Sequence, residues 1–145
     1  MTADAGEVVV DASVAMKWLV EEPGTAWAKS LAGPDTVLIA PELLLSECGN
    51  ALWRLTRTGV LSEAEQQDAH GDLAAAPVAI LACSLALHAE ALRTATRLRH
   101  PVYDCLYLAI ALDRGAALAT ADLRFIRVLR AAGLLPPGRL LTPPA

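Results

Sequence analysis

The sequence predicts a three-layer α/β/α sandwich in which helices cover both faces of a mainly parallel central sheet. Short aliphatic runs, the first of them β-branched, alternate with longer helical stretches from residue 7 to residue 141. No connection carries the Asn-Gly or Asp-Gly signal of a tight hairpin. Strands joined through helices pair in parallel, and such a sheet needs a helical layer on each face.

The first half of the chain is expected to hold two strands and three helices. A β-branched run predicts a buried strand at residues 7–10, and Ser13 is a suitable N-cap for the helix that follows. After a second short helix and a second strand, Pro41 opens a longer helix that Gly59 ends. The expected ranges are 7–10 and 36–40 for the strands, and 14–19, 25–31 and 42–58 for the helices.

The second half is expected to hold three strands and four helices. Residues 62–65, Ser-Glu-Ala-Glu, fit a capping box. Ser84 is the cap signal of the next helix, and Pro101 starts another that Gly115 closes. The last helix ends at Gly133. The expected ranges are 78–81, 116–119 and 139–141 for the strands, and 62–75, 85–98, 101–113 and 122–132 for the helices.

Length and composition favour one domain over residues 1–145. Of the 145 residues, 54% are hydrophobic and 19% are charged, which excludes a disordered or low-complexity chain. The three cysteines form no C-x-x-C pair and the three histidines lack metal-ligand spacing, so neither a disulfide framework nor a zinc site is expected. The acidic N-terminal residues and the lack of a long apolar run predict a cytoplasmic protein without signal peptide or membrane span.

The charge is distributed unevenly along the chain. The net charge of -4 argues mildly against a protein that holds nucleic acid by charge alone. Residues 1–92 carry 13 acidic and 4 basic side chains, whereas residues 93–145 carry 3 acidic side chains and 8 arginines. Such an Arg-rich segment is suited to phosphates or to an acidic patch on a partner, although solvated helix faces would also explain it.

Two acidic residues follow strands at the positions where parallel sheets bind ligands, beyond the carboxyl ends. Asp11 follows the first strand directly, and Asp122 follows the strand 116–119 with Thr120 in between. Capping of the next helix would explain either residue alone. Because Ser13 can cap the first helix, Asp11 is left for another role.

Two further acidic residues are expected on the apolar faces of helices. Neither Glu47 nor Asp104 has a Lys or Arg three or four residues away with which to pair. Buried carboxylates without partners are costly and rare. The structural alternative is that one of them caps a neighbouring helix or pairs with a distant arginine.

The four carboxylates would form a metal site if the fold brings them together. Like charges a few ångströms apart cannot all stay ionised without a cation, and oxygen ligands favour Mg²⁺, with Mn²⁺ as the alternative. Such a site can activate a water and stabilise charge on a phosphodiester. Three side chains are expected to support it, Ser13 and Thr120 by holding carboxylates or waters and Asn50 by orienting Glu47.

Four segments, in this order and spacing from near residue 8 to residue 130, give the sequence its family resemblance. They are Val8-Val9-Val10-Asp11-Ala12-Ser13, Ser46-Glu47-Cys48-Gly49-Asn50-Ala51-Leu52, Tyr103-Asp104-Cys105-Leu106-Tyr107-Leu108-Ala109 and Ala119-Thr120-Ala121-Asp122-Leu123-Arg124-Phe125. The sequence resembles the PIN-domain ribonucleases and is similar to the VapC-type toxins of bacterial toxin–antitoxin pairs. No single motif is specific for this family, but the four motifs in this order are a strong signal of it. Cys105 stands where the family usually has Ala.

The resemblance implies a Mg²⁺-dependent endoribonuclease with Asp11, Glu47, Asp104 and Asp122 around the metal. It also implies a homodimer and a VapB-type antitoxin that wraps the toxin and occludes its site. The number of ions, the carboxylate that acts as general base and the RNA that is cleaved stay open. Without these four residues, 12 acidic side chains face 12 basic ones, so the site itself would account for the net charge.

The arginines of residues 93–145 are expected to rim this acidic site and to receive RNA phosphates. The competing role is pairing with acidic residues of the antitoxin or across the dimer. The residues concerned are Arg93, Arg97, Arg99, Arg124, Arg127 and Arg130.

Other enzyme classes with a strand that ends in Asp fit the sequence less well. A haloacid dehalogenase-type phosphatase needs a second Asp where this chain has Ser13, and a response-regulator receiver domain needs an acidic pair that is absent. No Gly-rich turn follows a predicted strand, which excludes a P-loop or Rossmann nucleotide site. The remaining alternatives are a non-catalytic PIN-like binding or assembly module and a solitary RNA-processing nuclease.

Overall fold

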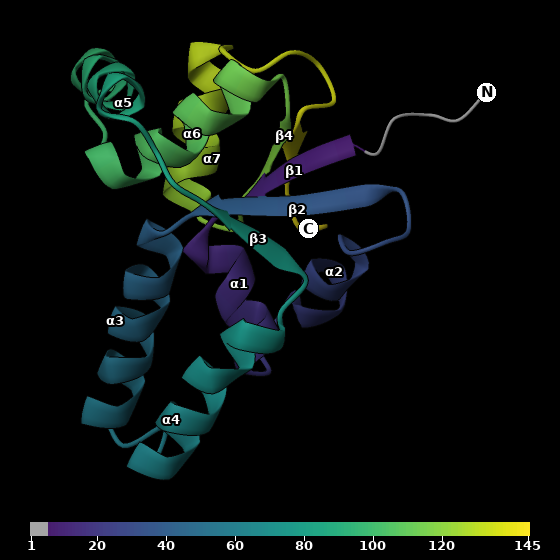
Figure 1. Ribbon diagram of the computed structural model, residues 1–145, viewed down its shortest axis with the longest axis vertical. Helices are drawn as coiled ribbons and strands as arrows, with labels where there is room; N and C mark the ends of the chain where they lie inside the picture. The colour runs from purple at the N-terminus through teal and green to yellow at the C-terminus, as the bar shows by residue number, and fades with distance from the viewer. Residues whose placement is uncertain (1–5) are drawn as a thin grey trace.

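The computed structural model describes residues 6–145, which form a five-stranded sheet between two layers of helices (Figure 1). The strands lie in the order β3-β2-β1-β4-β5, and every neighbouring pair runs parallel. The predicted α/β class is confirmed, and the described sheet is parallel throughout. The strands are β1 (Gly6–Val10), β2 (Thr36–Pro41), β3 (Val78–Leu81), β4 (Ala117–Ala119) and β5 (Leu140–Leu141).

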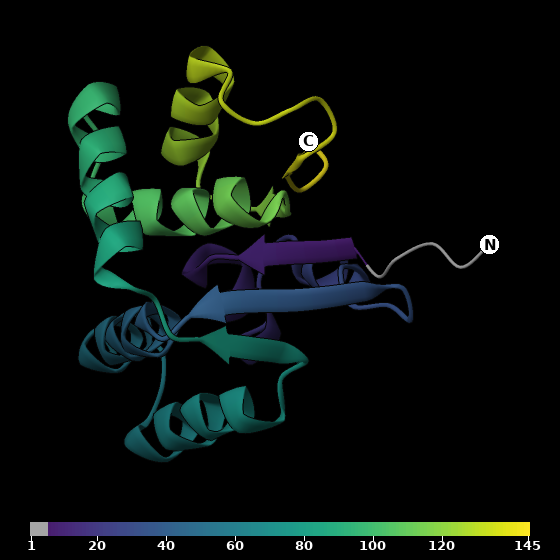
Figure 2. The same cartoon turned by 45° about the horizontal axis from the view of Figure 1, so that its top comes forward.

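Helices cover both faces of the sheet, as the sequence predicted. Helices α1 to α4 lie on one face and α5 to α7 on the other (Figures 1 and 2). This division follows from the strand order, because right-handed crossovers to strands on opposite sides of β1 run over opposite faces. The helices are α1 (Ala12–Leu19), α2 (Thr25–Ser30), α3 (Leu43–Arg57), α4 (Glu63–Gly71), α5 (Leu85–Leu98), α6 (Val102–Arg114) and α7 (Leu123–Ala132), with a 3₁₀-helix η1 (Asp72–Ala75) after α4.

The core is centred on strand β1 and helix α6. Val9 and Val10 of β1 have no exposed surface. Helix α6 packs against β1, β2 and β4 and against α5, and its residues 105–111 are buried without interruption. A helix that is apolar on every side is stable only when it is covered on every side. Helix α6 is therefore held firmly in place.

The chain changes direction across the sheet at β1, because β2 and β3 lie on one side of it and β4 and β5 on the other. In parallel sheets the crevice beyond the carboxyl ends at such a switch point is the usual ligand site. The backbone N–H of Asp11 donates to the carbonyl oxygen of Ala119 at 3.3 Å, which joins the ends of β1 and β4. This crevice is where the sequence places Asp11 and Asp122.

Three local predictions were wrong. Helix α1 begins at Ala12 because Asp11, not Ser13, is its N-cap. Pro41 belongs to β2, where it is the last residue of the strand and its missing N–H is tolerated, and α3 begins at Leu43. The predicted helix 62–75 changes from α-helix to 3₁₀-helix after residue 71, where Gly and Asp are poor helix formers.

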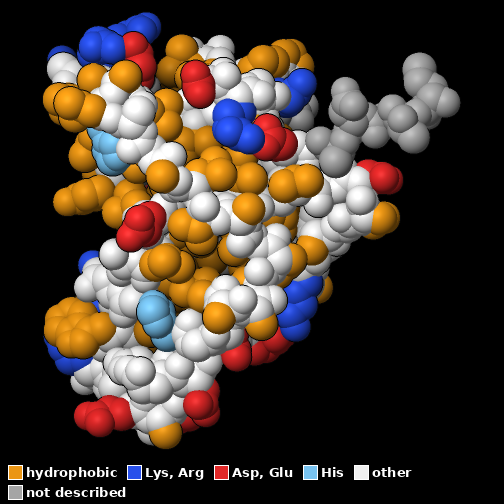
Figure 3. All heavy atoms as spheres, in the orientation of Figure 1, with side chains coloured by type: hydrophobic (Ala, Val, Ile, Leu, Met, Phe, Trp, Pro, Cys, Tyr) orange, Lys and Arg blue, Asp and Glu red, His pale blue; other side chains and the backbone are white. Residues whose placement is uncertain are grey.

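The face drawn in Figure 3 carries hydrophobic side chains across its middle, between the α5 and α6 end and the α3 and α4 end. Exposed apolar residues at the edge strand and at the start of α5 include Ile80 and Leu85. Within residues 6–145 no helix has both the length and the apolar character needed to cross a membrane.

Candidate active site

Asp11 lies at the end of β1, and its side chain caps α1. Its Oδ1 accepts hydrogen bonds from the backbone N–H of Val14 at 3.2 Å and from the hydroxyl of Ser13 at 2.5 Å. The prediction that Ser13 caps this helix failed because two capping residue types stand two positions apart, and local preference does not distinguish them. Asp11 is only 3% exposed, so its carboxylate is buried as well as capping.

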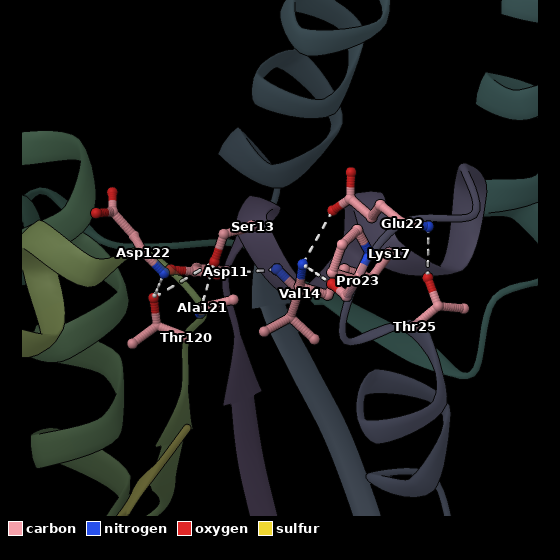
Figure 4. A network of polar contacts seen from close by, with 10 residues as sticks. All are labelled: Asp11, Ser13, Val14, Lys17, Glu22, Pro23, Thr25, Thr120, Ala121 and Asp122. Carbon is pink, nitrogen blue, oxygen red and sulfur yellow. Dashed lines mark hydrogen bonds and ion pairs between the residues drawn. The ribbon is translucent and has the colours of Figure 1, made fainter. Parts of the chain in front are cut away.

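Ser13, in the first turn of α1, and Thr120, directly after β4, connect the ends of strands β1 and β4 (Figure 4). The Ser13 hydroxyl accepts a hydrogen bond from the backbone N–H of Ala121 at 2.8 Å and lies 3.4 Å from the Thr120 hydroxyl. Thr120 is fully buried and accepts from the backbone N–H of Asp122 at 3.2 Å. These contacts fix Asp11 against the loop that carries Asp122.

Asp122 caps α7 from an exposed position. Its Oδ1 accepts hydrogen bonds from the backbone N–H groups of Arg124 at 2.9 Å and Phe125 at 3.2 Å. The capping explanation is therefore correct for both Asp11 and Asp122. It does not exclude a second role, because these hydrogen bonds occupy only one oxygen of Asp122.

Glu47 lies on α3 and is held from across the molecule. The hydroxyl of Tyr107, on α6, donates to its Oε1 at 2.6 Å. Burial, followed by the neighbouring Glu47, raises the pKa of Tyr107, so the hydroxyl keeps its proton and remains a donor. The sequence hid this partner because it lies 60 residues away. Asn50, which was expected to orient Glu47, is exposed and makes no hydrogen bond to it.

Asp104 lies in the first turn of α6 and is held by His100. The Nε2 of His100 lies 2.6 Å from Asp104 Oδ2, and the two residues are four positions apart. The sequence-based prediction considered only Lys and Arg as partners and so missed this contact, although its spacing is that of a helical pair. His100 is buried, and its ring stacks on that of Phe125, with centroids 5.0 Å apart and an interplanar angle of 11°.

The four carboxylates influence one another through Asp104. Burial is the main cause that raises the pKa of Asp11 to about 7, against hydrogen bonds from Ser13, Thr120 and Val14, and the charge of Asp104 adds to the rise. Burial and then the charge of Asp104 also raise the pKa of Glu47, against the hydrogen bond from Tyr107.

The pKa of Asp104 is itself raised, first by burial and then by the charge of Asp122, while His100 and Arg124 oppose the rise. Asp104 is thus within electrostatic range of each of the other three carboxylates.

The donor set fits a hard divalent cation. Glu47, Asp104 and Asp122 each accept hydrogen bonds through one oxygen only. Among the described residues the only buried side-chain nitrogen or oxygen atom without a partner is Nδ1 of His100, so the free oxygens of Glu47 and Asp104 reach solvent. Carboxylate oxygens are the ligands that Mg²⁺ prefers. As the side chains stand, no group of three or more Asp, Glu, His or Cys residues within 6–145 already has the arrangement of a metal site.

Only one of the six predicted RNA-binding arginines acts on the carboxylates. Arg124, in the first turn of α7, lowers the pKa of Asp104. Arg93 instead pairs with Glu90 and lines a separate pocket with Asp113 and Arg114, at the opposite end of α6 from Asp104. Arg99 is the C-cap of α5, and Arg97, Arg127 and Arg130 are exposed on α5 and α7.

A basic residue that was not predicted lies beside Glu47. Arg54, about two turns further along α3, lines a pocket of about 500 Å³ together with Glu47, Asn50 and Tyr103. The side chain of Tyr103 is prominent there, since the residue is 59% exposed. The spacing of seven residues between Glu47 and Arg54 places both on one helix face and would have been the signal in the sequence.

In metal-free protein we expect the free energy of unfolding to fall as the pH rises from about 5 to 8. The folded state keeps a proton on Asp11 up to a pH of about 7, whereas the unfolded chain loses it near 4. The folded state therefore binds more protons in this window, and stability present at low pH is lost, by about 2–3 kcal/mol for this group. Urea unfolding followed by tryptophan fluorescence at graded pH, with a chelator present, measures the loss.

Asp11→Asn should flatten that profile, because Asn keeps the cap but does not titrate. The control is Asp68→Asn, at an exposed position on α4, which should leave the profile as in the wild type. A pH profile for Asp11→Asn equal to that of the wild type would contradict the assignment.

Several solved structures share the fold of this chain. The protein PAE2754 from Pyrobaculum aerophilum is 24% identical with a TM-score of 0.65, over 89% of this chain and 91% of that one. The toxin VapC20 from Mycobacterium tuberculosis, which cleaves the sarcin–ricin loop, is 18% identical with a TM-score of 0.65, over 87% and 95%. VapBC2 from Rickettsia felis, solved bound to a DNA fragment from its promoter, is 14% identical with a TM-score of 0.63, over 94% of this chain and 96% of that one. No curated protein sequence matches the chain.

The similarity to these solved structures is a similarity of fold, and the family is established by the sequence match that follows. The model of the PIN domain family matches residues 8–130. That range includes all four carboxylates at the switch point and the segments on which the predicted resemblance rested. The resemblance is confirmed, and the chain belongs to the PIN-domain family.

Proposed function

We propose that this protein is a Mg²⁺-dependent endoribonuclease that acts as the toxin of a toxin–antitoxin pair. PIN domains are generally nucleases and are typically metal-dependent. The observation that carries the proposal is the electrostatic coupling of Asp104 to Asp11, Glu47 and Asp122 at the switch point of the sheet. A stable fold has no need of an acidic residue that repels three other carboxylates, whereas a cation site does.

The residues that would hold Mg²⁺, or Mn²⁺ in its place, are Asp11, Glu47, Asp104 and Asp122. When bound, the ion supplies activation of a water and neutralises charge that builds up on the phosphate. The chain's own contribution is to fix each carboxylate through hydrogen bonds at one oxygen, from Ser13 and Val14 to Asp11 and from Tyr107 to Glu47. Carboxylates held in this way need little reorganisation when substrate arrives.

RNA would lie over the pocket beside Glu47 and over the start of α7. Arg54 and Arg124 flank the carboxylates from α3 and α7, and both are exposed. We propose them as the arginines that receive phosphates, in place of the wider predicted set. The exposed ring of Tyr103 and the free amide of Asn50, on the wall of the pocket, would contact an unstacked base.

An antitoxin partner and a homodimer remain part of the proposal. The likeness of fold to VapC20, a toxin, and to VapBC2 supports a partner of the VapB type. A toxin gene should follow a short reading frame for a protein with a DNA-binding N-terminus. A solitary RNA-processing nuclease would lack that neighbour, and a non-catalytic binding module would lack activity on any RNA.

Asp104→Asn should abolish Mg²⁺-dependent RNA cleavage and growth inhibition while the protein stays folded and still binds its antitoxin. The substitution keeps the size of the side chain but removes the charge that couples to the other three carboxylates. Cleavage of a labelled total RNA sample and colony counts after induction measure the two effects.

The matched control is Asp113→Asn, at an exposed position on the last turn of the same helix, which should cleave and inhibit like the wild type. If Asp104→Asn is as toxic as the wild type, the proposal that the protein is a nuclease is contradicted, and a non-catalytic binding module is favoured.

Arg54→Ala and Arg124→Ala should each weaken RNA binding about 3- to 10-fold and make it less sensitive to salt. Each phosphate contact that is lost reduces the slope of log K against log salt by a little less than one for single strands. Binding of a fluorescent RNA to the Asp104→Asn protein at graded salt measures both quantities without cleavage. Arg93→Ala is the control, since Arg93 pairs with Glu90 away from the carboxylates. Equal salt slopes in all three variants would argue against these phosphate contacts.

A further inference from the structure

We propose that His100 and Phe125 are positioning residues that fix Asp104 in register with Asp122 for metal binding. The inference rests on the proposed function and concerns how this chain builds its carboxylate site. Two observations carry it, a hydrogen bond and a ring stack.

The hydrogen bond leaves Asp104 with one oxygen directed by the protein and one free. His100 Nε2 lies 2.6 Å from Asp104 Oδ2, and Nε2 must carry the hydrogen because the carboxylate oxygen accepts. The other ring nitrogen, Nδ1, is buried without a partner. A hydrogen on Nδ1 would be a buried donor left unsatisfied, which is costly. The ring therefore has a single use for its hydrogen, which is to orient Asp104.

The ring stack connects His100 to the start of α7. The His100 and Phe125 rings lie nearly parallel, at 11° and with 5.0 Å between centroids, and both residues are buried. The backbone N–H of Phe125 in turn donates to Oδ1 of Asp122 at 3.2 Å. A continuous chain of contacts thus runs from Asp122 through Phe125 and His100 to Asp104, and it joins two carboxylates that come from different helices.

The turn between α5 and α6 carries His100. Arg99 has a φ of 52° and is the only non-glycine residue with a positive φ in the described chain. Side chains other than Gly, Asn and Asp rarely adopt this conformation. The left-handed conformation of Arg99 ends α5 and lets the backbone N–H of His100 donate to the carbonyl oxygen of Ala95 at 3.1 Å. This is the usual left-handed end of a helix, and it places His100 directly after α5.

Three variants separate the donor from the ring. His100→Phe keeps an aromatic ring on Phe125 but offers no hydrogen to Asp104. His100→Gln keeps a donor without the stack, and Phe125→Leu removes the stack but leaves the histidine. Each is prepared as the full chain, and its affinity for Mn²⁺ is measured by titration calorimetry alongside its melting temperature.

We expect His100→Phe to bind Mn²⁺ about 10- to 100-fold more weakly than the wild type, which is the usual loss when a residue that hydrogen-bonds to a metal ligand is replaced. Its melting temperature should stay close to that of the wild type. His100→Gln should recover part of the affinity, and Phe125→Leu should weaken binding although every carboxylate is intact. If His100→Phe binds Mn²⁺ as tightly as the wild type, this inference is overturned, whereas the proposed function is not. A wild-type protein that binds no Mn²⁺ would overturn the proposed function, and the inference with it.

A second measurement applies even if a variant fails to fold. Long-range ¹⁵N–¹H NMR of the histidines in the wild-type protein reports which ring nitrogen of His100 carries the hydrogen. Hydrogen on Nε2 supports the contact with Asp104, whereas hydrogen on Nδ1 alone overturns it.

Discussion

The burial of acidic side chains, to which repulsion by Asp104 adds, is the constraint on which the site of this molecule depends. Asp104 lies within electrostatic range of Asp11, Glu47 and Asp122, and burial makes the charged form of the first two still less favourable. Side chains in that position would turn away into solvent unless something held them. The fold holds each through donors on one oxygen, and these donors are helix N-terminal N–H groups, hydroxyls and an imidazole. The other oxygens of Glu47 and Asp104 stay open to solvent.

The structural roles of Asp11 and Asp122 fall on the same residues as their proposed chemical roles. Asp11 and Asp122 each begin a helix, and the capping bonds that stabilise the helix also fix the direction of the carboxylate. Positioning through secondary structure is more rigid than positioning through a free loop. The capping role and the proposed role as metal ligand are therefore compatible, because the capping bonds leave carboxylate oxygen free at Asp122.

Elements and candidate residues could be read from the sequence, whereas the contacts between them could not. Hydrophobic periodicity and helix stop signals located all five strands and the helices within a few residues, because these are local properties. Glu47 and Asp104 stood out because the pattern placed charges on apolar helix faces. Their partners stayed hidden, since Tyr107 meets Glu47 only after the chain has folded. The contact of His100 with Asp104 was missed because only Lys and Arg were considered as partners of a carboxylate. Arg54 was missed because the arginines were sought in residues 93–145, where most of them lie.

The continuous burial of α6 has a consequence for how this protein can fail. The helix carries Asp104 and Tyr107, the turn before it carries His100, and residues 105–111 are all buried. A cavity left anywhere along that buried run lets a helix shift, and close-packed interiors pass such shifts on. A single shift of α6 would then misalign both Asp104 and Glu47, because Glu47 is held by Tyr107 of this helix. Loss of function by substitution is thus not confined to acidic residues, and for such a helix the distinction between a stability defect and an active-site defect disappears.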